Sequence, residues 1–191
     1  MRADSPIYGR VYARLESPAV VSFASQCSPI PEAEYQALLG SDLPPRAEPY
    51  TVDEVTEAVA SLHPGLELAE CSFARDRRFP PLTAILADGS GAGTLVYGPA
   101  IDDWRSRDLA NQEVILRRNG EPLRKGTAHE FLDHPMVPLT WLANELSRTG
   151  VGLKAGQMVS TGTLTGMLRP GAGEVYTADF GPCGSASATY A

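Results

Sequence analysis

Proline and glycine interrupt this chain at short intervals, with 16 Pro and 18 Gly spread over 191 residues. Proline removes a backbone hydrogen-bond donor and glycine favours turns, so the spacing predicts many short elements joined by turns rather than long helices. The sequence has no internal repeat, low-complexity tract or interdomain linker. We therefore expect residues 1–191 to form a single domain.

One helix is predicted over residues 52–62. Thr51 can act as its N-cap, and Glu54 three residues later completes a capping box. The helix is expected to end at His63, because Pro64 disfavours helical geometry at the residue before it. The apolar residues that recur at helical spacing are Val52, Val55, Ala58, Val59 and Leu62.

A second helix is predicted over residues 138–148, with Pro138 in its first turn and Gly150 as its stop. The other apolar segments are short and bounded by turn residues, which is typical of strands. The predicted strands are residues 82–86, 94–97, 113–118, 158–163, 174–180 and 185–190. The fold class we expect is α+β, rich in β-structure, with a few peripheral helices.

The charge of the chain argues against nucleic acid as a partner. The formal net charge is −7 and the pI is near 5.0, whereas phosphate binding needs clustered Lys and Arg. The best basic cluster, residues 75–78, is interrupted by an aspartate and is read as a solvated loop or, alternatively, a small anion site.

No apolar run approaches the roughly 20 residues of a membrane span, and the first residues lack the apolar core of a signal peptide. No membrane partner is therefore expected. Cys27, Cys71 and Cys183 are odd in number and far apart, so free thiols in a reducing cytoplasm are the simplest expectation.

Three glutamates are candidates for metal chemistry. Glu32 and Glu34 are two residues apart, so on a strand both carboxylates would point to one side, as oxygen ligands of a hard cation would. Such a pair is often only a surface feature. Glu67 follows the first helix in an apolar stretch, where an unpaired carboxylate is costly, although it could equally be the outward residue of an edge strand.

A hydroxyl-rich and glycine-rich segment lies in the C-terminal third. Ser160, Thr161, Gly162 and Thr163 can present backbone N–H groups and hydroxyls to a carboxylate or carbonyl, or can form a polar turn. The three histidines show no metal-site spacing, and no nucleophile elbow is present. His134 is expected to be structural, and Trp141 to help fill the core.

Several segments together resemble one family, in order and without large gaps. Residues 30–35 and 39–44 resemble a Glu-x-Glu strand followed by an "lgrdLP" turn, and residues 64–67 resemble the block that carries a third glutamate. Residues 87–91, 134–135, 141–144, 153–157, 161–163 and 179–185 resemble the later blocks. The chain is thus similar to the 2-keto-4-pentenoate hydratase and 4-oxalocrotonate decarboxylase branch of the fumarylacetoacetate hydrolase superfamily.

This resemblance implies a mixed β-sandwich roll that binds Mg²⁺ or Mn²⁺ and acts on small 2-oxo acids. Matching positions assign Glu32, Glu34 and Glu67 as metal ligands. Asp88 would transfer a proton or orient the site, and the 160–163 segment would bind the substrate carboxylate. The implied reaction is hydration of a 2-hydroxypenta-2,4-dienoate-like acid in aromatic catabolism, by a cytoplasmic homo-oligomer.

Two departures from the family pattern leave other functions open. Relatives begin with an additional segment whose Gly-x-Lys motif contributes a lysine, whereas this chain starts at what resembles the next block. The family's "dsR" sequence reads Glu70-Cys71-Ser72 here, so its arginine is absent. A decarboxylase, a C–C hydrolase, or a shortened non-catalytic paralogue that binds a ligand or partner are the alternatives.

Overall fold

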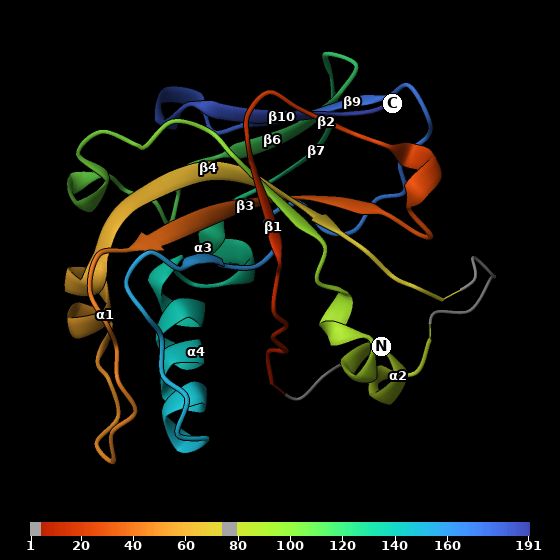
Figure 1. Ribbon diagram of the computed structural model, residues 1–191. Helices are drawn as coiled ribbons and strands as arrows, with labels where there is room; N and C mark the ends of the chain where they lie inside the picture. Colours follow the sequence, from red (N-terminus) through yellow and green to blue (C-terminus); the bar gives the residue numbers. More distant parts are fainter. Residues whose placement is uncertain (1–4, 74–79) are drawn as a thin grey trace.

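Two β-sheets form the body of the molecule in a computed structural model that describes residues 5–73 and 80–191 (Figure 1). The first sheet contains, in spatial order, β1 (Ala13–Glu16), β5 (Thr94–Tyr97), β4 (Val59–Ala69), β3 (Ile30–Leu39) and β8 (Met158–Ser160). The second contains β2 (Ala19–Val21), β10 (Ser185–Tyr190), β9 (Val175–Asp179), β6 (Val114–Arg118) and β7 (Glu121–Gly126). The chain has an α+β fold rich in β-structure, as predicted.

Short helices lie around the two sheets. The α-helices of the described residues are α1 (Val52–Ala58), α2 (Leu82–Ala87), α3 (Ala128–Phe131) and α4 (Met136–Arg148). The 3-10 helices are η1 (Phe23–Ser25), η2 (Gly89–Gly91), η3 (Trp104–Ser106) and η4 (Gly181–Cys183). Helices α1 and α4 pack together on the side of the first sheet that faces away from the second sheet (Figure 1).

The predicted helix at 52–62 is only half correct. The capping box of Thr51 and Glu54 is present and begins α1, but the helix ends at Ala58 and residues 59–62 open strand β4. Their pairing with β3 supplies non-local backbone hydrogen bonds that local helical spacing does not reveal. The expected stop at His63 is also wrong, because β4 continues to Ala69.

The predicted strand at 82–86 is wrong, because these residues form helix α2. The apolar pattern of so short a segment fits a helix as well as a strand, and here only Ile85 of the helix is fully buried. The second predicted helix is confirmed and begins two residues earlier, at Met136. The ring Nδ1 of His134 accepts a hydrogen bond from the Met136 N–H at 3.2 Å at the start of this helix, and its structural role stays a prediction.

The remaining predicted strands are confirmed, with small differences at their ends. They correspond to β5, β6, β8, β9 and β10, and the turn after β6 lies at Asn119 and Gly120. The largest difference is at β8, which ends at Ser160 rather than at residue 163. Strands β1, β2 and β7 were not predicted, and their sequences lack a clear apolar alternation.

The core between the sheets decides which way β3 points its side chains. Ala33, Tyr35 and Ala37 are fully buried, and the Tyr35 ring packs edge-on against Phe180 at 4.9 Å between centroids. Successive side chains on a strand alternate between its faces. Glu34 therefore points to the opposite side, toward the space bordered by α4.

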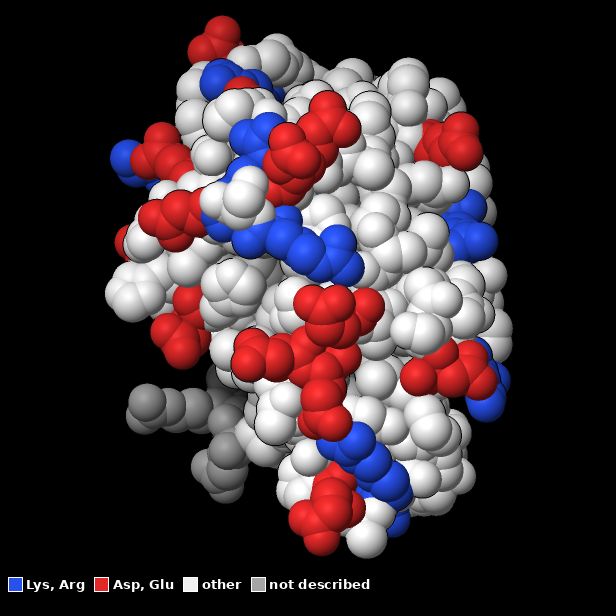
Figure 2. All heavy atoms as spheres, turned by 90° about the vertical axis from the view of Figure 1, so that its left-hand side faces the viewer, with Lys and Arg blue, Asp and Glu red and all other residues white. Residues whose placement is uncertain are grey.

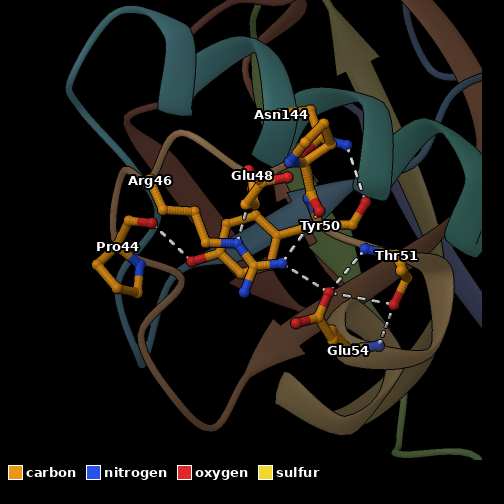
Figure 3. Close-up of polar contacts among 8 residues, drawn as sticks. Pro44, Arg46, Glu48, Tyr50, Thr51, Glu54 and Asn144 are labelled. Carbon is orange, nitrogen blue, oxygen red and sulfur yellow. Dashed lines mark hydrogen bonds and ion pairs between the residues drawn. The ribbon is translucent and has the colours of Figure 1, made fainter.

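A compact polar cluster fixes α1 against α4 (Figure 3). Arg46 forms an ion pair with Glu54 at 2.6 Å, and its guanidinium lies 3.7 Å from the centroid of the Tyr50 ring. The Tyr50 hydroxyl donates to the Pro44 carbonyl at 2.6 Å. The Asn144 side chain of α4 accepts from the Tyr50 N–H at 2.6 Å and donates to its carbonyl at 3.0 Å. The loop before α1 thereby holds α4 in place.

The described surface carries charges of both signs. Across the face turned to the viewer in Figure 2, acidic and basic side chains lie in small mixed groups. The basic cluster at 75–78 lies outside the described residues. The three cysteines are free thiols, as expected. None of the helices in the described residues combines the length and the apolar character that crossing a membrane requires.

Candidate active site

The three candidate glutamates lie on one face of the first sheet. Strands β3 and β4 are antiparallel, with Glu32 opposite Glu67 and Glu34 opposite Gly65. Residues directly opposite each other in such a pair project to the same side. The expectation that Glu32 and Glu34 share a face is confirmed. The alternative of an edge position for Glu67 is wrong, because β4 lies between β5 and β3.

Glu34 is the most enclosed of the three, with 2% of its surface exposed. Its carboxylate oxygen Oε2 accepts hydrogen bonds from the Ser160 hydroxyl and the Gly162 N–H, both at 2.7 Å. Burial raises the pKa of Glu34 well above its usual range, and repulsion by Glu67 and Glu32 raises it further. The two hydrogen bonds act in the opposite direction without removing this penalty.

Glu32 and Glu67 are half-buried and share the same electrostatic difficulty. Burial raises the pKa of each to about 7, and repulsion by Glu67 adds to the effect at Glu32. A hydrogen bond with Thr163 partly offsets the shift at Glu32. Three carboxylates of this kind resist joint ionisation unless a cation lies among them.

The donor chemistry therefore fits a hard divalent cation, which prefers carboxylate oxygens. Within residues 5–73 and 80–191, however, no three His, Cys, Asp or Glu side chains already stand in an arrangement that meets metal-site geometry. The fit rests on the shared sheet face, the burial and the mutual repulsion of the glutamates, and not on preformed coordination.

A cleft of about 980 Å³ opens over this face of the sheet. Glu34 and Glu67 contribute to its lining, whereas Glu32 does not. Trp141 was expected in the core but is half-buried in the cleft wall, where its ring meets Tyr8 edge-on at 6.0 Å between centroids. Leu142 and Leu146 extend the same apolar wall along α4. The cleft thus joins an acidic floor to an apolar side wall.

The hydroxyl-rich segment forms the edge of the cleft next to Glu34. Ser160, Thr161 and Gly162 line it, and Gly162 has a φ of 109°, a conformation that favours glycine. Thr161 is anchored to β3, since its N–H and hydroxyl both donate to the Tyr35 carbonyl, at 3.0 and 3.1 Å. In the described structure this segment orients Glu34, and its contact with substrate stays a prediction.

Asp88 does not lie on the strands that carry the three glutamates. It follows α2, its carboxylate accepts a hydrogen bond from the Ser72 N–H at 2.9 Å, and it is not among the described residues that line the cleft. Its role in proton transfer stays a prediction.

Two arginines that line the cleft, Arg10 and Arg14, were not predicted from the sequence. They precede the first predicted strand, so no pattern pointed to them.

Comparison with known proteins decides the family. The model of the fumarylacetoacetate hydrolase C-terminal domain matches residues 19–188. The chain belongs to the fumarylacetoacetate hydrolase family. Within this family it is 29% identical over 184 residues to 2-keto-4-pentenoate hydratase of Paraburkholderia xenovorans strain LB400, covering 95% of this chain and 67% of that relative. It is 26% identical over 192 residues to 4-oxalocrotonate decarboxylase of Pseudomonas putida, covering 100% and 71%.

A solved structure of a relative supports the same placement. The 4-oxalocrotonate decarboxylase from Pseudomonas putida G7, complexed with magnesium and adipate, superposes with a TM-score of 0.87. The two proteins are 25% identical, and the match covers 98% of this chain and 71% of that chain. The relatives in this branch of the fumarylacetoacetate hydrolase family are hydratases and decarboxylases, so the chain has the fold of a family of enzymes.

Proposed function

We propose that this chain is a divalent-metal-dependent lyase that acts on small 2-oxo and 2-hydroxydienoic acids, with Glu32, Glu34 and Glu67 as the metal ligands. The observation that carries the proposal is the gathering of three carboxylates with raised pKa values on one sheet face, two of them at the cleft. Mg²⁺ or Mn²⁺ suits such oxygen donors. The related decarboxylase complexed with magnesium supports the choice of a dication.

The bound metal would supply Lewis acidity toward the carboxylate and keto oxygens of a 2-oxo acid. The chain's own residues would then position the reactants. Ser160 and Gly162 hold the Glu34 carboxylate through two short hydrogen bonds. The apolar wall at Trp141 and Leu142 would contact the carbon chain of the substrate and keep bulk water from it.

The reaction we propose is addition of water to a 2-hydroxypenta-2,4-dienoate-like acid, which gives a 4-hydroxy-2-oxo acid. Such a reaction belongs to the catabolism of aromatic compounds, and we place it in the cytoplasm. Proton transfer at the dienoate carbons would fall to Asp88 or to a group not yet assigned. One catalytic domain over residues 1–191 and self-association of the chain are parts of the same proposal.

A decarboxylase is the second candidate, because Lewis acidity toward the keto oxygen of a 2-oxo acid would also favour loss of CO₂. The observation that favours it is the TM-score of 0.87 to 4-oxalocrotonate decarboxylase. C–C hydrolysis of a related keto acid is a further alternative within the family.

The test is an assay of the full chain with 2-hydroxypenta-2,4-dienoate, with and without Mg²⁺ or Mn²⁺. We expect metal-dependent loss of the dienoate's ultraviolet absorbance, which E34Q abolishes. CO₂ release from a 2-oxo dicarboxylic acid, or cleavage of an acylpyruvate, would instead identify one of the alternatives. Metal binding without any turnover at high protein concentration would contradict the enzyme proposal and favour a non-catalytic paralogue.

A further inference from the structure

A row of residues across the first sheet links the glutamates to an arginine. Arg14 of β1 lies opposite Leu95 of β5, Leu95 lies opposite Glu67 of β4, and Glu67 lies opposite Glu32. Arg14, Leu95 and Glu67 all line the cleft, so they share its side of the sheet. Neighbouring strands are about 4.8 Å apart, which places the Arg14 backbone roughly 10 Å from that of Glu67.

Arg14 extends toward the opposite rim of the cleft. Its Nη1 donates to the Gly156 carbonyl at 3.4 Å, a long hydrogen bond to the loop before β8. Glu16, the next residue on that side of β1, accepts a hydrogen bond from the Tyr97 hydroxyl at 3.2 Å. In the described part of the chain, neither Arg14 nor Arg10 has an acidic partner within ion-pair distance.

The charges of the cleft are therefore separated. Among its described lining residues, the acids Glu34 and Glu67 lie on the floor, and the cations are Arg10 and Arg14 on the N-terminal segment. An elongated ligand in this space would meet a metal-binding end and a guanidinium end. A guanidinium binds a carboxylate with two parallel hydrogen bonds, a geometry that an ammonium does not reproduce.

We propose that Arg14, assisted by Arg10, binds a second carboxylate at the far end of the substrate. Within the proposed class of small 2-oxo and 2-hydroxydienoic acids, the preferred substrates would then carry a second carboxylate at the far end, which 2-hydroxypenta-2,4-dienoate itself lacks. This inference rests on the proposed function, because it takes the 2-oxo acid end to be held at the glutamates. It assigns a specificity role to residues outside the glutamate site.

The test uses two unreactive probes that differ only at the far end, 2-oxoadipate and 2-oxohexanoate. Binding of each to the full chain is measured by calorimetry with saturating Mg²⁺. We expect 2-oxoadipate to bind about ten-fold more tightly or better, as a charge-assisted hydrogen bond allows. R14A should lose this preference while its affinity for 2-oxohexanoate stays unchanged. R14K should recover only part of it.

The matched control is R124A, which removes an exposed arginine of β7 in the other sheet and should keep the preference. Equal binding of the two probes by the unsubstituted chain would overturn the inference and leave the proposed function standing. Equal weakening of both probes by R14A would also overturn it, since Arg14 would then act at the 2-oxo acid end. If neither probe binds in the presence of Mg²⁺, the proposed function fails and the inference with it.

Discussion

At the scale of single residues, Glu34 combines near-complete burial with a carboxyl group whose pKa burial raises well above its usual range. Its two hydrogen bonds, from Ser160 and Gly162, satisfy one oxygen and hold the carboxylate in place. They do not remove the cost of ionising it there, because burial of an uncompensated charge is costly. A residue of this kind is easier to explain as a ligand than as a stabilising element of the sheet.

We predict that E34Q weakens Mg²⁺ binding by about ten-fold or more. Removing a residue that only orients a metal ligand already weakens metal binding by about ten-fold, and removing a ligand itself should weaken it at least as much. The amide keeps the size of the side chain and removes its charge. In the absence of metal, the melting temperature should be unchanged or higher, because the charge repulsion is relieved. Calorimetric titration with Mg²⁺ and thermal unfolding in EDTA measure the two effects.

The control for this substitution is E121Q, which removes an exposed charge from β7 at the edge of the second sheet. It should leave both quantities unchanged. Wild-type Mg²⁺ affinity in E34Q would contradict the assignment of Glu34 as a ligand.

Gly65 shows how closely the sheet is packed beside the site. It lies opposite Glu34, and a Cβ added to it would stand 2.4 Å from the Gln36 side chain. Gln36 is fully buried, and its amide nitrogen donates to the Leu66 carbonyl at 3.1 Å. The absence of a side chain at position 65 lets Gln36 cross over β4.

We predict that G65A destabilises the chain by about 1–3 kcal/mol, the usual cost of overpacking. The double variant G65A/Q36A removes the side chain that the new methyl group would meet. It should therefore be less destabilised than the sum of the two single variants. Urea unfolding of all four proteins measures this coupling, and strictly additive effects would show that Gln36 is not the obstacle.

At the scale of elements, helix α1 has only seven residues, which is too short for a stable isolated helix. Its stability therefore rests largely on the polar contacts at its N-terminus. Hydrogen bonds from Arg46 and from the Thr51 N–H lower the pKa of Glu54 to about 2. A folded-state pKa below the unfolded value means that the ionised carboxylate stabilises the fold above about pH 4.5. This contribution is lost as the pH falls toward 2.

We predict that E54Q lowers the melting temperature at neutral pH and that this difference shrinks between about pH 5 and pH 2. Glutamine still suits the capping box, so the substitution mainly removes the ion pair. E57Q, on the exposed side of the same helix, is the control and should show no such pH dependence. A difference between wild type and E54Q that is constant with pH would argue against an ion-pair contribution.

At the scale of the whole molecule, metal binding and folding should be linked. The three glutamates come from two strands that meet only in the folded sheet, so the unfolded chain does not form the site. A ligand that binds only the folded state raises its stability by RT ln(1 + [L]/Kd), about 2.7 kcal/mol at 100 times Kd.

We therefore predict that Mg²⁺ raises the melting temperature of the wild-type chain in a concentration-dependent way and that EDTA reverses the shift. Thermal unfolding followed by circular dichroism over a range of Mg²⁺ concentrations measures it. E34Q should require much higher Mg²⁺ for the same shift. A melting temperature independent of Mg²⁺ and Mn²⁺ in the wild type would count against a metal centre.

Features carried by neighbouring residues could be predicted from the sequence. The capping box at Thr51, the alternation that puts Glu32 and Glu34 on one side of β3, and the turn at Asn119 and Gly120 all follow from local chemistry. The fold class and the order of the family's sequence blocks could also be recognised from the sequence. Residues 59–62 and 82–86 were misassigned because short apolar segments fit both helix and strand.

By itself, the sequence determined the types of side chain available and the local conformations that they favour. Only the tertiary structure decided that Glu67 stands opposite Glu32, that β4 is interior to its sheet, and that Arg14 lies across the cleft from the loop at Gly156. The physical reason is that strand pairing joins residues distant along the chain. Its register depends on burial of the whole sheet face and not on any one segment.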